Sequence, residues 1–185
     1  MLFSTLALAA ASSLAFFAEA APTNELPGLV TLKQFTSRDG ASLITVYGDA
    51  EGSQSQSLPH PPHPSLLAAA RDLDGDCGGN TLVCNNKHLA NREACAGLIH
   101  DLASEDGQAA LPESPRSICG SYGGSQCCVS WHNPVSGAVR ASLVNAALKT
   151  LEGCAGNTGV SGKTMHTYIG ETCTNQCLSD RPKGC

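Results

Sequence analysis

Alternating apolar and polar positions predict a β-hairpin in the first third of the chain. The runs Leu29–Phe35 and Ser42–Tyr47 are rich in β-branched and aromatic side chains, and a polar turn around Asp39 and Gly40 separates them. An isolated hairpin is only marginally stable in water. This hairpin is therefore expected to dock on another part of the chain.

Further strands are predicted in the second half of the chain. The segments Arg116–Tyr122 and Gln126–Trp131 are β-prone and flank a glycine-rich turn, and Val160–Ile169 is another β-prone run. Successive side chains of a strand point to opposite faces of its sheet. The adjacent Cys127 and Cys128 are therefore expected to form disulfide bonds with elements above and below the sheet.

Two other segments show helical periodicity. The first helix is expected to begin at a cap formed by Asn85 or Asn86 and to run to about Ser104. Its apolar face includes Cys95, which is expected to link the helix to a strand. The apolar positions of this pattern are Leu89, Cys95, Leu98, Ile99 and Leu102.

The second helix is predicted over Gly137–Glu152, with a cap at Ser136 and a stop at Gly153. Its apolar stripe places Arg140 and Lys149 on the side that faces solvent.

The order of these elements predicts the fold class. A glycine-rich loop or short strand at Cys77–Cys84 comes before the first helix, and strands then surround the second helix. This order predicts an α+β fold, with two helices packed on one face of a small, mainly antiparallel sheet that disulfide bonds staple. The chain has only one Trp and four Phe, so the disulfide bonds are expected to supply much of the stability.

Cysteine usage indicates the compartment. The chain of 185 residues contains ten cysteines, and all of them follow residue 76. This density is typical of a secreted disulfide scaffold, and an even number allows every cysteine to pair. No Cys-x-x-Cys pair is present, so a zinc site is not expected. The cysteines expected to form disulfide bonds are Cys77, Cys84, Cys95, Cys119, Cys127, Cys128, Cys154, Cys173, Cys177 and Cys185.

The chain is predicted to have three regions. Residues 1–20 are typical of a signal peptide, because a short apolar run leads to the small residues Ala18 and Ala20. Residues 21–76 are interpreted as an acidic N-terminal arm or pro-segment with a Pro-, His- and Ser-rich linker, and residues 77–185 as a cysteine-rich domain. The protein is therefore expected to be secreted and extracellular, with no stable membrane span.

Charge argues against nucleic acid as a partner. The formal net charge is −5, and residues 77–185 carry eight Lys and Arg against eight Asp and Glu, with no basic block. The cations of this region are expected to form a scattered, solvated surface. Those expected to be exposed are Lys87, Arg92, Arg140, Lys149, Lys163, Arg181 and Lys183.

Motifs for catalysis or for cofactor binding are weak. The segment Gly156–Thr164 resembles a phosphate-binding loop, but its first glycine is one position too early. His60 and His63 belong to a proline-rich spacer, which does not suit a metal site. No Gly-x-Ser-x-Gly elbow accompanies the histidines. The protein is therefore expected not to be an enzyme, and to bind neither a metal nor a cofactor.

One small aromatic group is a candidate binding site. Tyr122, Trp131 and His132 lie at the ends of predicted strands and could together form a platform for a sugar. The alternative is that the tryptophan packs in the core, which is common for a lone Trp at a strand end.

Several cysteine-containing segments carry a family resemblance. They are Cys77–Cys84, the helix with Cys95, Ser114–Cys119, Gln126–Trp131 and Cys177–Cys185. Together they resemble the fungal WD-like domain family of small secreted proteins without established chemistry. The layout is also similar to killer-toxin-like folds, found in smut toxins and fungal effector proteins. The resemblance covers roughly residues 77–185 and implies no catalytic residue.

These observations predict a secreted, cysteine-rich fungal protein that acts by binding, in the manner of an effector or a killer toxin. Its unknown extracellular ligand is expected on a host surface, on a competitor surface or in a cell wall. Two alternatives stay open, a wall-associated structural or carbohydrate-binding protein and a small secreted hydrolase. An enzyme would need a concave pocket that joins a histidine to an acid or a nucleophile.

Overall fold

A computed structural model of the protein describes residues 28–50, 77–111, 115–135 and 137–185. The predicted signal peptide, the Pro-, His- and Ser-rich linker with His60 and His63, and the predicted cap Ser136 lie outside the described residues. The division of the chain into a signal peptide, an arm and a cysteine-rich domain stays a prediction.

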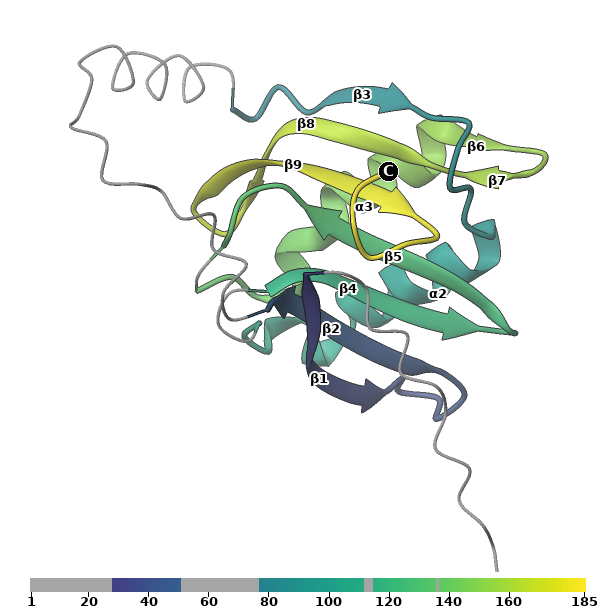
Figure 1. The fold of residues 1–185 in the computed structure, drawn as a ribbon, viewed down its shortest axis with the longest axis vertical. Coiled ribbons are helices and arrows are strands. Elements are labelled where there is room, and N and C mark those ends of the chain that lie inside the picture. Colours follow the sequence, from purple (N-terminus) through teal and green to yellow (C-terminus); the bar gives the residue numbers. More distant parts are fainter. Residues whose placement is uncertain (1–27, 51–76, 112–114, 136) are drawn as a thin grey trace, which may run out of the picture.

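One seven-stranded antiparallel sheet dominates the described fold (Figure 1). Its strand order is β1-β2-β4-β5-β9-β8-β3, and a separate ribbon of β6 and β7 completes the β-structure. The strands of the large sheet are β1 (Leu29–Thr36), β2 (Leu43–Asp49), β3 (Thr81–Cys84), β4 (Pro115–Tyr122), β5 (Ser125–Trp131), β8 (Gly162–Ile169) and β9 (Thr172–Ser179). The ribbon consists of β6 (Ala155–Gly156) and β7 (Gly159–Val160).

The helical elements are short. Helix α2 (Arg92–Ala103) contacts β4 and β5, and helix α3 (Val144–Cys154) contacts β3, β8 and β9. The 3-10 turn η1 (Glu105–Gln108) follows α2, and the 3-10 turn η2 (Arg140–Leu143) leads into α3.

The predicted fold class is wrong. The sheet is large, with seven strands, and a second sheet accompanies it, so that antiparallel β-structure defines the fold instead of two helices on a small sheet. One cause is β9, a strand that the apolar pattern does not predict. Its Gln176 is almost completely buried and donates a hydrogen bond to the Leu143 carbonyl (2.8 Å). A buried polar residue removes the apolar signal that a central strand usually gives.

The N-terminal hairpin enlarges the sheet further. Strands β1 and β2 form the predicted hairpin, and β2 pairs along β4, with Val46 opposite Ile118. The Arg140 guanidinium also lies 3.8 Å from the centre of the Phe35 ring of β1. The hairpin is therefore docked on the cysteine-rich part, as its marginal intrinsic stability requires.

Arg140 is buried, so its predicted exposure is wrong. It lies in η2, where the helical phase differs from that of the α-helix that the sequence pattern assumed. Burial lowers the pKa of this guanidinium.

Helix α2 begins later than predicted. The cap is Asn91, whose side-chain oxygen accepts hydrogen bonds from the backbone N–H groups of Glu93 (2.8 Å) and Ala94 (3.0 Å). Residues 85–89 form no helix, and Ala90 makes an isolated β-bridge to Val160. The predicted buried positions from Cys95 to Leu102 are buried in the structure and belong to the hydrophobic core.

Candidate functional site

All ten cysteines are paired. The five disulfide bonds are Cys77–Cys173, Cys84–Cys154, Cys95–Cys127, Cys119–Cys128 and Cys177–Cys185. The disulfide bonding that the cysteine density predicts is confirmed.

The adjacent cysteines of β5 point to opposite faces, as predicted, but only one of them reaches another layer. Cys127 bonds Cys95 of α2, which also confirms the predicted link between that helix and a strand. Cys128 bonds Cys119, its directly opposite partner on β4. The expectation that Cys128 bridges to an element outside the sheet is therefore wrong, because its partner lies in the same sheet.

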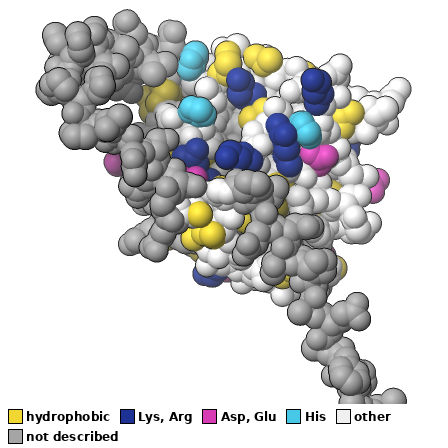
Figure 2. Space-filling view, viewed as in Figure 1, with side chains coloured by type: hydrophobic (Ala, Val, Ile, Leu, Met, Phe, Trp, Pro, Cys, Tyr) yellow, Lys and Arg dark blue, Asp and Glu magenta, His cyan; other side chains and the backbone are white. Residues whose placement is uncertain are grey.

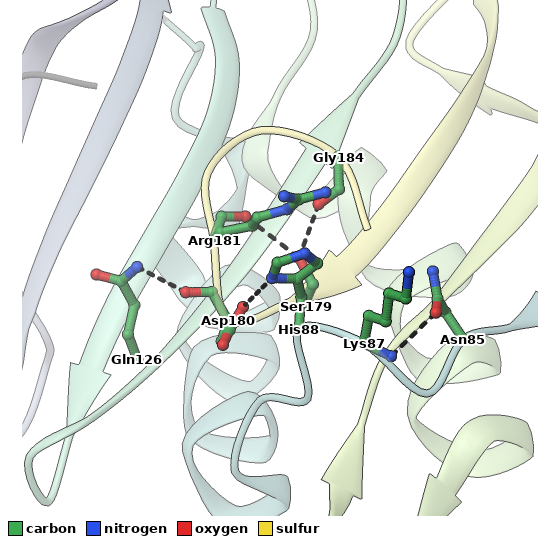
Figure 3. A network of polar contacts seen from close by, with 8 residues as sticks. All are labelled: Asn85, Lys87, His88, Gln126, Ser179, Asp180, Arg181 and Gly184. Carbon is green, nitrogen blue, oxygen red and sulfur yellow. Dashed lines mark hydrogen bonds and ion pairs between the residues drawn. The ribbon is translucent and has the colours of Figure 1, made fainter. Parts of the chain in front are cut away.

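A further disulfide bond closes the C-terminal loop, which we define as residues 180–185. Cys185 returns to Cys177 on β9. The Ser179 hydroxyl is within hydrogen-bond distance of the carbonyls of Arg181 (3.2 Å) and Gly184 (2.9 Å). The Gln126 side-chain amide of β5 donates to the Asp180 carbonyl (2.9 Å). These contacts hold the backbone of the loop against the sheet (Figure 3).

The segment between β3 and α2 is joined to this loop. The Asp180 backbone N–H donates to the His88 carbonyl (3.1 Å), and His88 Nδ1 lies 3.7 Å from Asp180 Oδ1. The neighbouring Lys87 is fixed by its backbone N–H, which donates to the Asn85 side chain (3.0 Å). Figure 3 shows His88 between the loop and the Lys87 backbone. Lys87 is thereby placed beside the loop.

Lys163 belongs to the same face of the sheet. It lies on β8 directly opposite Cys177, and directly opposed residues share a face. Its neighbour Thr164 points the other way, where its hydroxyl lies 3.2 Å from the Ala146 carbonyl of α3. Lys163 therefore projects on the side where the Cys177–Cys185 bond closes the loop.

Four cations gather around the closed loop, and we call them the basic surface. They are Lys87, Lys163, Arg181 and Lys183. Figure 2 shows dark blue side chains grouped on the face where β8, β9 and the loop lie in Figure 1. The prediction that these cations are scattered is therefore wrong for these four. Chain folding brings them together from three separate segments.

The cations of the basic surface have no carboxylate partner in the part of the chain that the structure describes. Within residues 28–50, 77–111, 115–135 and 137–185, none of the four cations forms an ion pair with a carboxylate. The one nearby acid in the loop, Asp180, faces His88. In addition, Arg181 Nε is buried and has no hydrogen-bond acceptor among the described residues.

The predicted aromatic platform is not assembled. Trp131 is only 5% exposed and packs in the core, whereas His132, next in the chain, is exposed. Tyr122 pairs with Ser125 at the opposite end of β5. Trp131 lies six positions after Ser125 along the strand, which corresponds to about 20 Å. Trp131 and Tyr122 therefore cannot contact one ligand together as a small platform.

Tyr122 has a packing environment of its own. Its hydroxyl donates to Asp101 of α2, and its ring lies against Gly97 of α2 and Gly120 of β4. Partial burial and the contact with the Asp101 carboxylate raise the pKa of Tyr122 well above its ordinary value. The more exposed aromatic side chain is Tyr168 of β8, 48% exposed, which the sequence did not single out.

Concave sites in the described structure are small. A hollow of about 280 Å³ lies between the start of α2 and the turn of the β6–β7 ribbon, lined by residues 91–93 and 156–159. A second hollow, of about 180 Å³, lies beside it near Tyr122. The lining of both hollows contains Glu93 but no histidine or cysteine.

The phosphate-loop-like segment has a structural role. Gly156 and Gly159 pair with each other across the β6–β7 ribbon on either side of its turn, and Gly162 begins β8. In the described part of the chain, no group of three or more His, Cys, Asp and Glu side chains is arranged to hold a metal ion. Likewise, no helix of the described ranges is long and apolar enough to cross a membrane.

Fold and cysteine framework define a cysteine-rich, disulfide-stapled antiparallel β-protein. The model of the family described as Fungal WD-like matches residues 68–185, more than half of the chain. The chain therefore belongs to the Fungal WD-like family, which confirms that part of the sequence resemblance. No curated protein and no solved structure matches the chain. The similarity to killer-toxin-like folds stays a prediction.

Proposed function

We propose that this protein is secreted and acts by binding an extracellular target, without catalysis, in the manner of an effector or a toxin. One observation carries the proposal, namely four cations that have no carboxylate partner among the described residues, on a face built around the disulfide-closed C-terminal loop. The apolar N-terminal segment and the five disulfide bonds support export to an oxidising compartment.

Binding is favoured because the loop is organised before any partner arrives. Ordering a flexible loop during association costs free energy, and a covalently closed loop has largely met that cost during folding. Hydrogen bonds from Gln126 and Ser179 restrict the same backbone further. A rigid surface with unpaired charges suits recognition of a complementary surface.

The hydrolase alternative has less support from the described residues. Hydrolysis by acid–base chemistry needs a histidine or carboxylate within reach of a nucleophile in a concave site. Both hollows are shallow regions at turns, and Glu93 is the only carboxylate in either lining.

The proposal is tested with the purified, oxidised secreted protein. It is incubated with intact cells and isolated walls of fungi and plants, and bound protein and growth inhibition are measured. We expect binding that a Cys177→Ser/Cys185→Ser variant loses, while circular dichroism shows that its sheet is retained. Absence of binding to every surface, or turnover of a glycan or peptide substrate by the intact protein, would contradict the proposal.

A further inference from the structure

We propose that the basic surface binds an acidic polysaccharide, a chain of uronic acid sugars whose carboxylates meet its cations. This inference rests on the proposed binding function and names the chemistry of the target. The surface lies on one face of the sheet, away from both hollows, and combines β8, the segment before α2 and the C-terminal loop.

The first argument is that the cations of this surface are grouped without carboxylate partners among the described residues. Among the described residues, Arg116 is the one Lys or Arg with a carboxylate partner, Asp49 at 3.5 Å, so it is the grouping of four unpaired cations that distinguishes the basic surface. Among the described residues, the four cations of the basic surface have no such partner. A carboxylate of a ligand can engage an accessible guanidinium through two parallel hydrogen bonds, and it can approach each lysine ammonium as a point charge.

The second argument is the distribution of charge over the molecule. Five acids of the described structure lie on the helical elements: Glu93 and Asp101 on α2, Glu105 and Asp106 on η1, and Glu152 on α3. The basic surface lies on β8, on the segment before α2 and on the closed loop instead, and its one acid, Asp180, faces His88. This separation leaves a locally positive face on a chain whose formal net charge is −5. Such a face attracts an anion in spite of the overall charge.

The third argument favours a chain-like ligand over a small anion. The four cations come from elements that lie side by side on a sheet face, and none of them lines either of the two hollows described above. An extended polymer with one carboxylate per sugar can contact such cations in succession. Each contact is weak when solvated, so several contacts along one chain are needed for affinity.

Two other polyanions fit less well. Double-stranded DNA carries one charge for about every 1.7 Å of helix axis, a density that four cations on a net acidic protein match poorly. An anionic membrane would favour exposed apolar side chains beside the cations. The loop does not supply such a side chain, because Pro182 is buried. Among the large exposed hydrophobic side chains of the described residues, only Val83 lies directly opposite a cation of the surface, Lys163.

The test measures affinity of the oxidised, full secreted chain for polygalacturonate, with neutral glucan, phosphatidylserine vesicles and duplex DNA as comparison ligands. The variant Lys87→Glu/Lys163→Glu reverses two charges of the surface. The matched control Arg92→Glu/Lys149→Glu makes the same change in net charge on α2 and α3. We expect the surface variant to lose about tenfold or more in affinity and the control less than about twofold. Binding of the wild type should weaken with added salt.

Equal losses in both variants, or tighter binding to vesicles, DNA or neutral glucan than to polygalacturonate, would overturn the inference. Should a double variant unfold, Lys183→Gln alone gives the same comparison against Lys149→Gln. Attachment to cells without affinity for polygalacturonate removes this inference and leaves the proposed function standing. Failure to attach to any surface removes both.

Discussion

The packing of Tyr122 predicts that one substitution, Gly97→Ala, destabilises the protein when Tyr122 is present and stabilises it when Tyr122 is replaced. Gly97 lies in the middle of α2, and a methyl group added there would meet two ring atoms of Tyr122 at 2.8 Å. The ring cannot move away easily, because Gly120 lies against it and its hydroxyl is bonded to Asp101. The variant Gly97→Ala therefore introduces a steric conflict into a helix position.

Two opposing effects set the magnitude. Replacing glycine by alanine inside a helix normally stabilises by about 1 kcal/mol. Overpacking against a fixed neighbour typically costs about 1–3 kcal/mol. We expect a net destabilisation of about 1 kcal/mol for Gly97→Ala. In a Tyr122→Leu background the conflict is removed, and the same substitution should stabilise by up to about 1 kcal/mol.

The assay is equilibrium unfolding in guanidinium chloride without reductant, followed by circular dichroism. A matched control is Ala96→Gly on the exposed side of the same helix. It should destabilise by about 1 kcal/mol in both backgrounds. Stabilisation by Gly97→Ala in the wild-type background, or equal effects in both backgrounds, would refute the packing that the structure gives to Tyr122.

Three further predictions concern stability. The pKa of Tyr122 is raised in the folded state, so its stabilising contribution is complete below the ordinary tyrosine pKa of about 10 and is lost as pH rises above it. The denaturant concentration at the unfolding midpoint should therefore decrease as the pH is raised above that value. The decrease should be less steep in Tyr122→Phe, and equal slopes in the two proteins would contradict this. The variant Cys177→Ser/Cys185→Ser removes a disulfide bond of sequence separation 8 and should lower the free energy of unfolding by about 2.5 kcal/mol. An unchanged free energy of unfolding would contradict this prediction. Phe35→Leu removes the ring beneath Arg140 and should lower the free energy of unfolding in urea by about 1–2 kcal/mol. If the same substitution lowers it equally in an Arg140→Met background, the contact between the cation and the ring contributes nothing.

Local pattern predicts the strands that have an apolar alternation. The runs that become β1, β2, β4, β5 and β8 carry β-branched or aromatic residues and turn signals, and each forms a strand within a few residues of its expected bounds. Strand β9 lacks that signal, because its buried positions include Thr174 and Gln176. Their hydrogen bonds to other elements, such as Gln176 to Leu143, exist only in the folded chain.

Capping residues are ambiguous for a similar reason. The sequence predicts a helix start at Asn85 or Asn86, and the observed cap, Asn91, is a third asparagine of the same type. The pairing of Ala90 with Val160 holds the segment before Asn91 in a β-bridge, so the helix begins later. That pairing joins residues far apart in the sequence, which local reasoning does not detect.

The basic surface illustrates the same limit at the level of function. The closed loop with Arg181 and Lys183 is visible in the sequence as a terminal Cys-x7-Cys segment. Lys87 and Lys163 join it only through the His88–Asp180 contacts and the pairing of β8 with β9. Sequence reasoning therefore identifies the cations individually and misses their assembly. The predicted group of Tyr122 and Trp131 is wrong because two residues that are close in the sequence lie far apart in the fold. Tyr122 lies at the turn of the β4–β5 hairpin, and Trp131 lies at its open end.

Lysine acetylation of the native protein, followed by mass spectrometry, tests the central claim most directly. The modification rates of Lys87, Lys163 and Lys183 are compared with those of Lys33 and Lys149, with and without polygalacturonate. Our account predicts that the polymer protects the three lysines of the basic surface and leaves the other two unchanged. Equal protection of all five lysines, or protection confined to Lys33 and Lys149, would contradict it.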